Sequence, residues 1–190
     1  MGGLPRPITW FLVTLLVISG LVTCGGDTTP TPDPTTVQDH FQKGNEYAQA
    51  GDFEKAVVEY QAVLEAEPEN VSVLTNLGVV YYSLGQLDEA IAQYNKALEL
   101  APQDADIHSN LAAAYVQKGE LEKARQSYQR AIDFDPSLAE AHFGLGVVYM
   151  QMGDAEQARQ AFTRFQEYDT GKDPLASEKA KEYLQRLGGQ

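Results

Sequence analysis

Three histidines stand at related positions of this sequence, and histidine is a common ligand of protein-bound zinc. His40 and His108 are 68 residues apart, and His142 follows His108 after a further 34. A zinc site needs its imidazole nitrogens within about 2.0–2.1 Å of one ion. If each interval of 34 residues builds one packed unit, equivalent side chains in successive units lie about 10 Å apart, the usual spacing of packed helices. We therefore expect three separate packing contacts and no metal site.

The remaining groups that could carry catalysis do not form a catalytic pattern. The single cysteine, Cys24, lies near the N-terminus, before the segments with helical patterns. The sequence has no glycine-rich loop of the kind that cradles phosphate. Its 27 Asp and Glu residues fall mostly at positions that a helix exposes to solvent. We therefore expect a protein that is not an enzyme, with no catalytic residues and no cofactor.

The charge of the chain limits its partners. With 14 Lys and Arg against 27 Asp and Glu, the formal net charge is −13 at pH 7. Binding to nucleic acid requires clustered cationic side chains that neutralise phosphates. Nucleic acid is therefore excluded as a partner, and so is strong adhesion to anionic lipid headgroups. The acidity serves solubility, or it favours a basic segment of a protein partner.

The elements that must position any binding residue follow from a repeat of 34 residues. Columns at this interval run through Tyr47, Tyr81, Tyr115 and Tyr149; Gly51, Gly85, Gly119 and Gly153; Ala56, Ala90, Ala124 and Ala158; Tyr60, Tyr94, Tyr128 and Phe162; and Gly44, Gly78, Ala112 and Gly146. A fixed period of 20–50 residues indicates stacked units, none of which can bury its apolar face alone. We expect the small residues to let helices approach closely and the aromatic residues to fill the space between them.

The second unit has the fullest pattern, and it resembles the tetratricopeptide repeat family. Its template residues are Leu74, Leu77, Gly78, Tyr81, Ala90, Tyr94 and Pro102, with Leu74 where the family favours Trp. We expect one helix over Val71–Leu84, a turn at Gly85-Gln86, and a second helix over Asp88–Leu100 that Pro102 stops. The resemblance covers residues 37–170. It implies an all-α fold, a right-handed superhelical solenoid of four helix–turn–helix units plus a C-terminal capping helix.

The repeat register divides the chain into segments. The four units span residues 37–70, 71–104, 105–138 and 139–172, and residues 173–190 form the capping helix. Asp173-Pro174 predicts the start of this cap, as an N-cap followed by proline in the first helical turn. An apolar stripe follows at helical spacing, through Ala176, Ala180, Tyr183, Leu184 and Leu187. Such a helix covers the last apolar face of a solenoid.

The N-terminal segment predicts export. Residues 8–22 are almost wholly apolar, they follow Arg6, and no further Lys or Arg occurs before Lys43. This asymmetry is typical of a secretory signal that keeps the N-terminus on the cytoplasmic side while the rest crosses the membrane. We assign residues 1–23 as a signal peptide or membrane anchor, and residues 24–36 as a Thr/Pro-rich disordered tether.

The cysteine stands where such a signal is cut. Leu21-Val22-Thr23-Cys24 resembles a bacterial lipobox, although Thr23 departs from the Gly, Ala or Ser expected there. The resemblance implies lipidation of Cys24 and a place on the extracytoplasmic face of a membrane in the bacterial cell envelope. An uncleaved short anchor and ordinary secretion are the alternatives.

In tetratricopeptide proteins, side chains of the first helix of each unit line a concave groove. By resemblance, the groove residues of this chain are Phe41, Asn45, Thr75, Val79, Tyr82, Asp106, Ser109, Val116, Glu140, Phe143, Val147 and Met150. This mixture is apolar with two carboxylates. It suits an amphipathic or extended apolar peptide that carries a nearby Lys or Arg.

Some relatives grip the terminal carboxylate of a peptide with two lysines, an arginine and two asparagines. Asn45 and Asn76 match the asparagine places of this clamp. Phe41, Asp106 and Asn110 stand at its three basic places. The clamp has lost its positive charge, so we do not expect this chain to bind a terminal carboxylate.

These patterns together predict a membrane-anchored adaptor that binds a protein or peptide segment in its groove and takes part in the assembly of an envelope complex. One alternative is a structural solenoid that self-associates through its ends. Another is an anchored adaptor that faces the cytoplasm.

Overall fold

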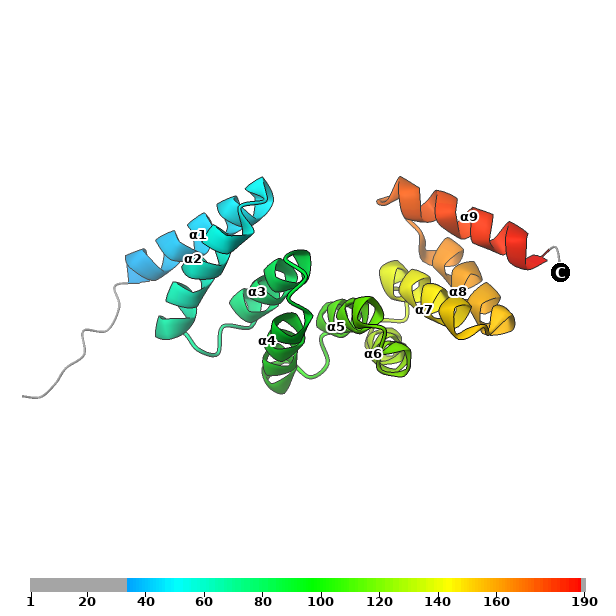
Figure 1. Cartoon of the computed structure of the whole chain (residues 1–190), viewed down its shortest axis with the longest axis horizontal. Helices are drawn as coiled ribbons and strands as arrows, with labels where there is room; N and C mark the ends of the chain where they lie inside the picture. Colours follow the sequence, from blue (N-terminus) through cyan, green and yellow to red (C-terminus); the bar gives the residue numbers. More distant parts are fainter. Residues whose placement is uncertain (1–33, 189–190) are drawn as a thin grey trace, which may run out of the picture. The chain divides into compact units, whose positions relative to one another are not determined.

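The computed structural model describes residues 34–188, and within that range it contains nine α-helices and no strand (Figure 1). The helices are α1 (Pro34–Ala50), α2 (Phe53–Ala66), α3 (Val71–Ser83), α4 (Leu87–Leu100), α5 (Ala105–Lys118), α6 (Leu121–Phe134), α7 (Ala139–Met152), α8 (Ala155–Tyr168) and α9 (Pro174–Gly188). The expected all-α fold is confirmed. The two helices predicted for the second unit are found within one residue of their predicted bounds.

The first eight helices form four helix–turn–helix pairs. We call the first helix of each pair (α1, α3, α5 and α7) the A helix and the second (α2, α4, α6 and α8) the B helix. Each helix packs against the next along the chain, and α9 packs against α8. The A helices also meet one another, since α3 contacts α5 and α5 contacts α7. The solenoid of helix–turn–helix units that the family resemblance implied is confirmed.

The turns form where the sequence predicts them. Gly85 follows α3 with a φ of 74°, in the left-handed region that favours glycine, as predicted. The turns before α3 and α5 end on side chains that cap the next helix, whereas the turn before α7 ends on Leu138, which provides no side-chain cap. Asn70 accepts a hydrogen bond from the backbone N of Val73 at 3.1 Å, and Asp104 accepts one from Ile107 N at 3.0 Å.

The core repeats with the same period as the sequence. Ala56, Ala90, Ala124 and Ala158 have no exposed surface, and the aromatic column Tyr60, Tyr94, Tyr128 and Phe162 is buried in every unit. The tyrosines at the other aromatic column are only half-buried at the margins of this core. The B-helix column therefore supplies the central aromatic residues of the fold.

Glycine lies beneath the aromatic ring in three of the four units. A Cβ added to Gly44 would lie 2.7 Å from Cδ1 of Tyr60, and one added to Gly78 would lie 2.5 Å from Cε1 of Tyr94. Real Cβ atoms do not approach so closely, so these rings rest directly on the backbone of the A helix. Close contact between A and B helices depends on this pairing.

In the third unit the aromatic ring packs over a glycine of the following unit instead of its own. This unit carries Ala112 where the other units have glycine, and its ring, Tyr128, packs instead over Gly144 of the next A helix. A Cβ at Gly144 would overlap the phenol ring and its hydroxyl. The third unit thus has Ala112 at the glycine position, and the fourth unit provides Gly144 for the ring of Tyr128. This contact packs the third unit against the fourth.

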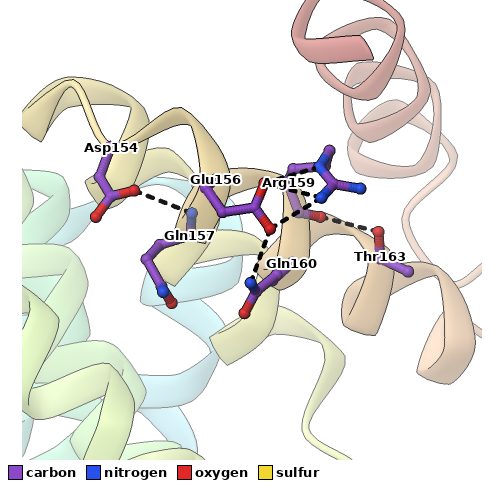
Figure 2. Close-up of polar contacts among 6 residues, drawn as sticks. All are labelled: Asp154, Glu156, Gln157, Arg159, Gln160 and Thr163. Carbon is purple, nitrogen blue, oxygen red and sulfur yellow. Dashed lines mark hydrogen bonds and ion pairs between the residues drawn. The ribbon is translucent and has the colours of Figure 1, made fainter.

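The outer surface of the B helices carries local polar pairs, as α8 illustrates (Figure 2). Asp154 caps the helix by accepting from Gln157 N at 3.1 Å, and Glu156 binds Arg159 at 2.8 Å within one turn. These side chains are exposed, and exposed pairs of this kind contribute little to stability. Their effect is to keep the outer face of the helix polar and solvated.

The predicted capping helix is confirmed as α9. Asp173 accepts hydrogen bonds from Leu175 N and Ala176 N, both at 3.0 Å, so it is the N-cap before Pro174. The predicted apolar stripe packs against α8, and Ala180 at its centre is fully buried. The helix thereby covers the aromatic residues Phe162 and Phe165 of α8.

Several predictions concern residues outside the described range. The signal or anchor at residues 1–23, the lipidation of Cys24 and the tether as far as position 33 all lie there. The first described helix begins at Pro34, so residues 34–36, which were predicted to be part of the disordered tether, are helical in the structure. Among residues 34–188, no helix has the length and apolar character needed to cross a membrane.

Gly78→Ala is expected to lower the free energy of unfolding by about 1–3 kcal/mol, the usual cost of an extra methyl group in a packed core. Chemical denaturation followed by circular dichroism measures this loss. The double variant Gly78→Ala/Asn110→Gly copies the arrangement of the third unit, so its loss should be smaller than the sum of the two single losses. Simple additivity would contradict the account of Tyr128 and Gly144 given above.

Candidate functional site

The predicted groove residues lie on a row of adjacent A helices. Asn76 of α3 donates a hydrogen bond to Oδ1 of Asn45 of α1 at 3.2 Å, and α5 contacts both α3 and α7. The side chains assigned to the groove therefore come from one continuous layer of helices. We call this surface the A-helix face.

Three of the predicted residues are openly exposed on this face. Val79 of α3 is 42% exposed, which is high for a large apolar side chain in a packed helix. Asp106 of α5 is exposed, and the side chain of Glu140 of α7 is 60% exposed. The other nine are half-buried: Phe41, Asn45, Thr75, Tyr82, Ser109, Val116, Phe143, Val147 and Met150.

At the N-terminal end of the face, two predicted residues pack against the fold itself. The ring of Phe41 lies 6.4 Å from that of Tyr60, measured between centroids. The hydroxyl of Tyr60 donates to Asn45 Oδ1 at 2.7 Å, and Asn76 donates to the same oxygen. Asn45 thus satisfies a buried hydroxyl and links two A helices, a structural task that the repeat pattern did not reveal.

At the C-terminal end, the predicted residues Phe143, Val147 and Met150 pack against the cluster that α8 and α9 form. Phe143 meets Phe162 and Phe165 edge to face, at centroid distances of 5.7 and 5.3 Å. A substitution of Phe143 would therefore disturb the core as well as any ligand. Exposed positions such as Val79 are better places to test binding.

Tyr82 lies in the middle of the face, close to two buried tyrosines of the B helices, Tyr94 and Tyr128. Tyr82 is half-buried on α3 and packs against the core cluster that contains Tyr94. Burial raises the pKa of both Tyr94 and Tyr128, and the nearby Tyr82 adds a smaller effect in the same direction. Tyr94 and Tyr128 therefore stay protonated at neutral pH within the core, and of these three tyrosines Tyr82 is the one that a ligand on the face can contact.

Two cavities border the A-helix face. One, of about 220 Å³, lies between α1 and α3 and is lined by residues that include Asn45 and Val79. The other, of about 340 Å³, lies beside the N-terminal ends of α7 and α9, and its lining includes Glu140 and Phe143. Four of the predicted groove residues therefore line cavities large enough to take part of a side chain.

The three histidines make separate contacts, as predicted. His40 Nδ1 lies 2.6 Å from Glu59 Oε2. His108 and His142 each place Nε2 about 3 Å from a proline carbonyl oxygen, and each stacks on an aromatic ring of the B helix in its own pair. Within the described residues, no three His, Cys, Asp or Glu side chains converge in a way that could hold a metal ion.

The larger cavity includes residues that the sequence analysis did not select. Tyr168, Asp169, Lys172 and Asp173 come from the end of α8 and the turn before α9. A sequence signal for them is present, because Thr170 stands where the other units have proline. In the structure this turn is also one residue longer than the turns between the other pairs. This break in the register is the sequence feature that marks the change of structure at the cavity.

The sequence matches a known family over most of its length. The profile described as TPR repeat matches residues 44–85, 80–119 and 113–153, and the profile described as tetratricopeptide repeat matches residues 139–171. No curated protein matches the chain.

Solved structures with the same architecture are numerous. MamA from Desulfovibrio magneticus is 28% identical, with a TM-score of 0.67 over 72% of this chain and 77% of that one. A tetratricopeptide repeat protein from Parabacteroides merdae is 27% identical, with a TM-score of 0.69 over 82% of this chain and 61% of that one. The first TPR of Spaghetti (RPAP3), solved with the HSP90 peptide SRMEEVD, is 25% identical to this chain. Its TM-score is 0.61, over 65% of this chain and 98% of that one.

Asn45→Ala is expected to lower the free energy of unfolding by about 1–3 kcal/mol, because it leaves the buried Tyr60 hydroxyl without its acceptor. The double variant Tyr60→Phe/Asn45→Ala removes both partners and should recover much of this loss. Thermal and chemical denaturation of the three proteins measures the effect. If Asn45→Ala leaves stability unchanged, the hydrogen bond does not have the structural role assigned to it.

Proposed function

Because this chain belongs to the tetratricopeptide repeat family, a family of non-enzymatic protein-interaction scaffolds, we propose that it binds a peptide segment of a partner protein along its A-helix face. Membership also agrees with the expectation that the chain is not an enzyme. The observation that carries the proposal is Val79. This valine remains 42% exposed on an A helix and lines a cavity between two A helices.

The charges on the face indicate which peptides fit. Asp106 and Glu140 are exposed on successive A helices, and the whole chain carries a formal net charge of −13. A segment that combines apolar side chains with Lys or Arg would complement this surface. The related RPAP3 domain was solved with an acidic peptide, SRMEEVD. This chain has Phe41, Asp106 and Asn110 at the basic places of the carboxylate clamp. We therefore expect it to prefer a basic peptide over an acidic one.

Val79→Arg is expected to weaken partner binding about tenfold or more, because a bulky charged side chain would replace an apolar contact at the centre of the face. Val58→Arg is the matched control, since Val58 is 64% exposed on the B helix α2. Crosslinking in the native host, followed by affinity measurement with the partner it identifies, compares the two variants. Equal binding by Val79→Arg and the wild type would exclude this face as the binding surface.

Self-association is the competing structural role. If crosslinking yields only copies of this chain, light scattering on residues 34–190 decides the matter. A monomer at high concentration excludes association through the ends of the solenoid. A larger species that Val79→Arg leaves intact would support the structural solenoid in place of the adaptor.

We infer that the scaffold is held at the extracytoplasmic face of a membrane by a lipid on Cys24. Support comes from the sequence alone: an apolar segment at residues 8–22, the lipobox-like Leu21-Val22-Thr23-Cys24, and a Thr/Pro-rich stretch after it. Two acyl chains anchor a protein stably, whereas one chain binds only marginally. Residues 24–33 would then separate the repeat domain from the lipid surface.

Cys24→Ser is expected to move the protein from the membrane fraction to the soluble fraction, because it removes the acylated thiol. Fractionation and the mass of the mature N-terminus measure this change. A Cys24→Ser protein that stays in the membrane would favour an uncleaved anchor. A membrane-impermeant thiol reagent, applied to intact cells that carry a cysteine engineered between Thr28 and Thr36, separates the extracytoplasmic adaptor from the cytoplasm-facing one.

A further inference from the structure

The larger cavity lies at the end of the last repeat, where the sequence departs from its register. It has a volume of about 340 Å³. Its walls come from the turn before α7, the first turns of α7, the end of α8 and the turn that leads into α9. The size is at the lower end of the range for ligand sites, which suits one long side chain better than a whole small molecule.

The inner wall of the cavity is aromatic. Phe143 and Phe165 meet edge to face at 5.3 Å between centroids, and Tyr168 lines the cavity beside them. Tyr168 is held by stacking on His142, at 5.4 Å between ring centroids. Aromatic faces of this kind attract a cation or the aliphatic stem of a charged side chain.

The rim of the cavity is acidic. Four carboxylates line it, Asp135, Glu140, Asp169 and Asp173, against the single ammonium group of Lys172. Lys172 Nζ lies 3.9 Å from Glu140 Oε1, and the two side chains are 84% and 60% exposed, so it neutralises the rim only loosely. The rim therefore keeps an excess of negative charge.

The carboxylates are fixed in place by the backbone around them. Asp173 Oδ1 accepts from Leu175 N and Ala176 N, and Asp135 Oδ1 accepts from the backbone N and the hydroxyl of Ser137. The hydrogen bonds from Ser137 lower the pKa of Asp135, which keeps this group ionised at neutral pH. In both residues these bonds use only Oδ1, so Oδ2 can receive a donor from a ligand.

We propose that this cavity binds the cationic side chain, arginine or lysine, of a peptide segment that lies on the A-helix face. The proposal rests on the proposed function and adds a specificity pocket to it. The aromatic wall takes the stem of the side chain and the carboxylate rim takes its charge. Glu140 and Phe143 belong to both the cavity and the predicted groove. A peptide that lies on the A-helix face can therefore place a side chain in the cavity while the rest of the peptide stays on the face.

Charge also decides against other occupants. An acidic or phosphorylated side chain would meet four carboxylates. If the chain is cleaved before Cys24, as proposed above, the N-terminal stretch offers no cationic side chain to the cavity, because residues 24–42 contain no Lys or Arg. The cationic group therefore comes from another molecule.

A titration of the ¹⁵N-labelled full chain in detergent micelles with Nα-acetyl-arginine amide tests the cavity directly. The neutral isostere Nα-acetyl-citrulline amide and the anionic Nα-acetyl-glutamate amide are the ligand controls. We expect shifts for arginine at the amides of Glu140, Phe143 and Thr170, with weak affinity in the millimolar range for so small a ligand. Equal shifts with citrulline or glutamate amide, or shifts spread evenly over the acidic surface, would overturn the proposal.

Two variants separate the cavity from the general acidity of the chain. Glu140→Gln/Asp173→Asn removes two rim charges while Asn keeps the helix cap, and it should weaken arginine binding about threefold or more. Glu65→Gln/Glu99→Gln removes two exposed charges from the B helices α2 and α4 and should leave binding unchanged. Lys172→Gln removes the competing cation and should strengthen binding. Equal weakening by the two double variants would show nonspecific attraction and overturn the proposal.

The partner found by crosslinking distinguishes this proposal from the proposed function. If Val79→Arg abolishes partner binding and Glu140→Gln/Asp173→Asn leaves it unchanged, the A-helix face is the binding surface and the specificity pocket is wrong. If neither variant changes binding, the A-helix face itself is excluded. A loss with both variants, together with arginine-specific shifts, supports the pocket.

Discussion

The contact between an aromatic ring on each B helix and a glycine on an A helix sets the geometry of this protein. Tyr60, Tyr94 and Phe162 rest on the backbone of the A helix in their own pair, and Tyr128 rests on the next one at Gly144. A Cβ at these glycines would overlap the ring. Any larger residue there would therefore force the two helices apart. The spacing of the pairs, and hence the A-helix face, depends on this contact.

The same packing explains why only part of the predicted groove is available to a partner. Side chains such as Asn45 and Phe143 complete the interior, one by accepting from a buried hydroxyl and the other by packing edge to face within an aromatic cluster. Val79, Asp106 and Glu140 project from the same helices and remain exposed. Stability and recognition thus share the A helices but use different positions on them.

Charge is distributed differently over the two layers. On B helices such as α8, carboxylates pair with arginines one turn away, so their fields largely cancel. Around the cavity beside α7 and the turn before α9, four carboxylates accompany one lysine and lie beside aromatic side chains. An acidic surface next to aromatic rings is suited to cationic, partly apolar segments, which is the chemistry that both proposals require.

The sequence alone determined the repeat fold, through the 34-residue period and the family resemblance, and it also determined the turn at Gly85 and the capping helix after Asp173, because helix pairing and helix ends depend on local residue types. The separate contacts of the three histidines also followed from that period. Which groove residues are exposed was decided only by the tertiary structure, since burial depends on the neighbouring pairs and on α9. The cavity at Phe143, Tyr168 and Asp173 likewise exists only because the last turn brings α7, α8 and α9 together.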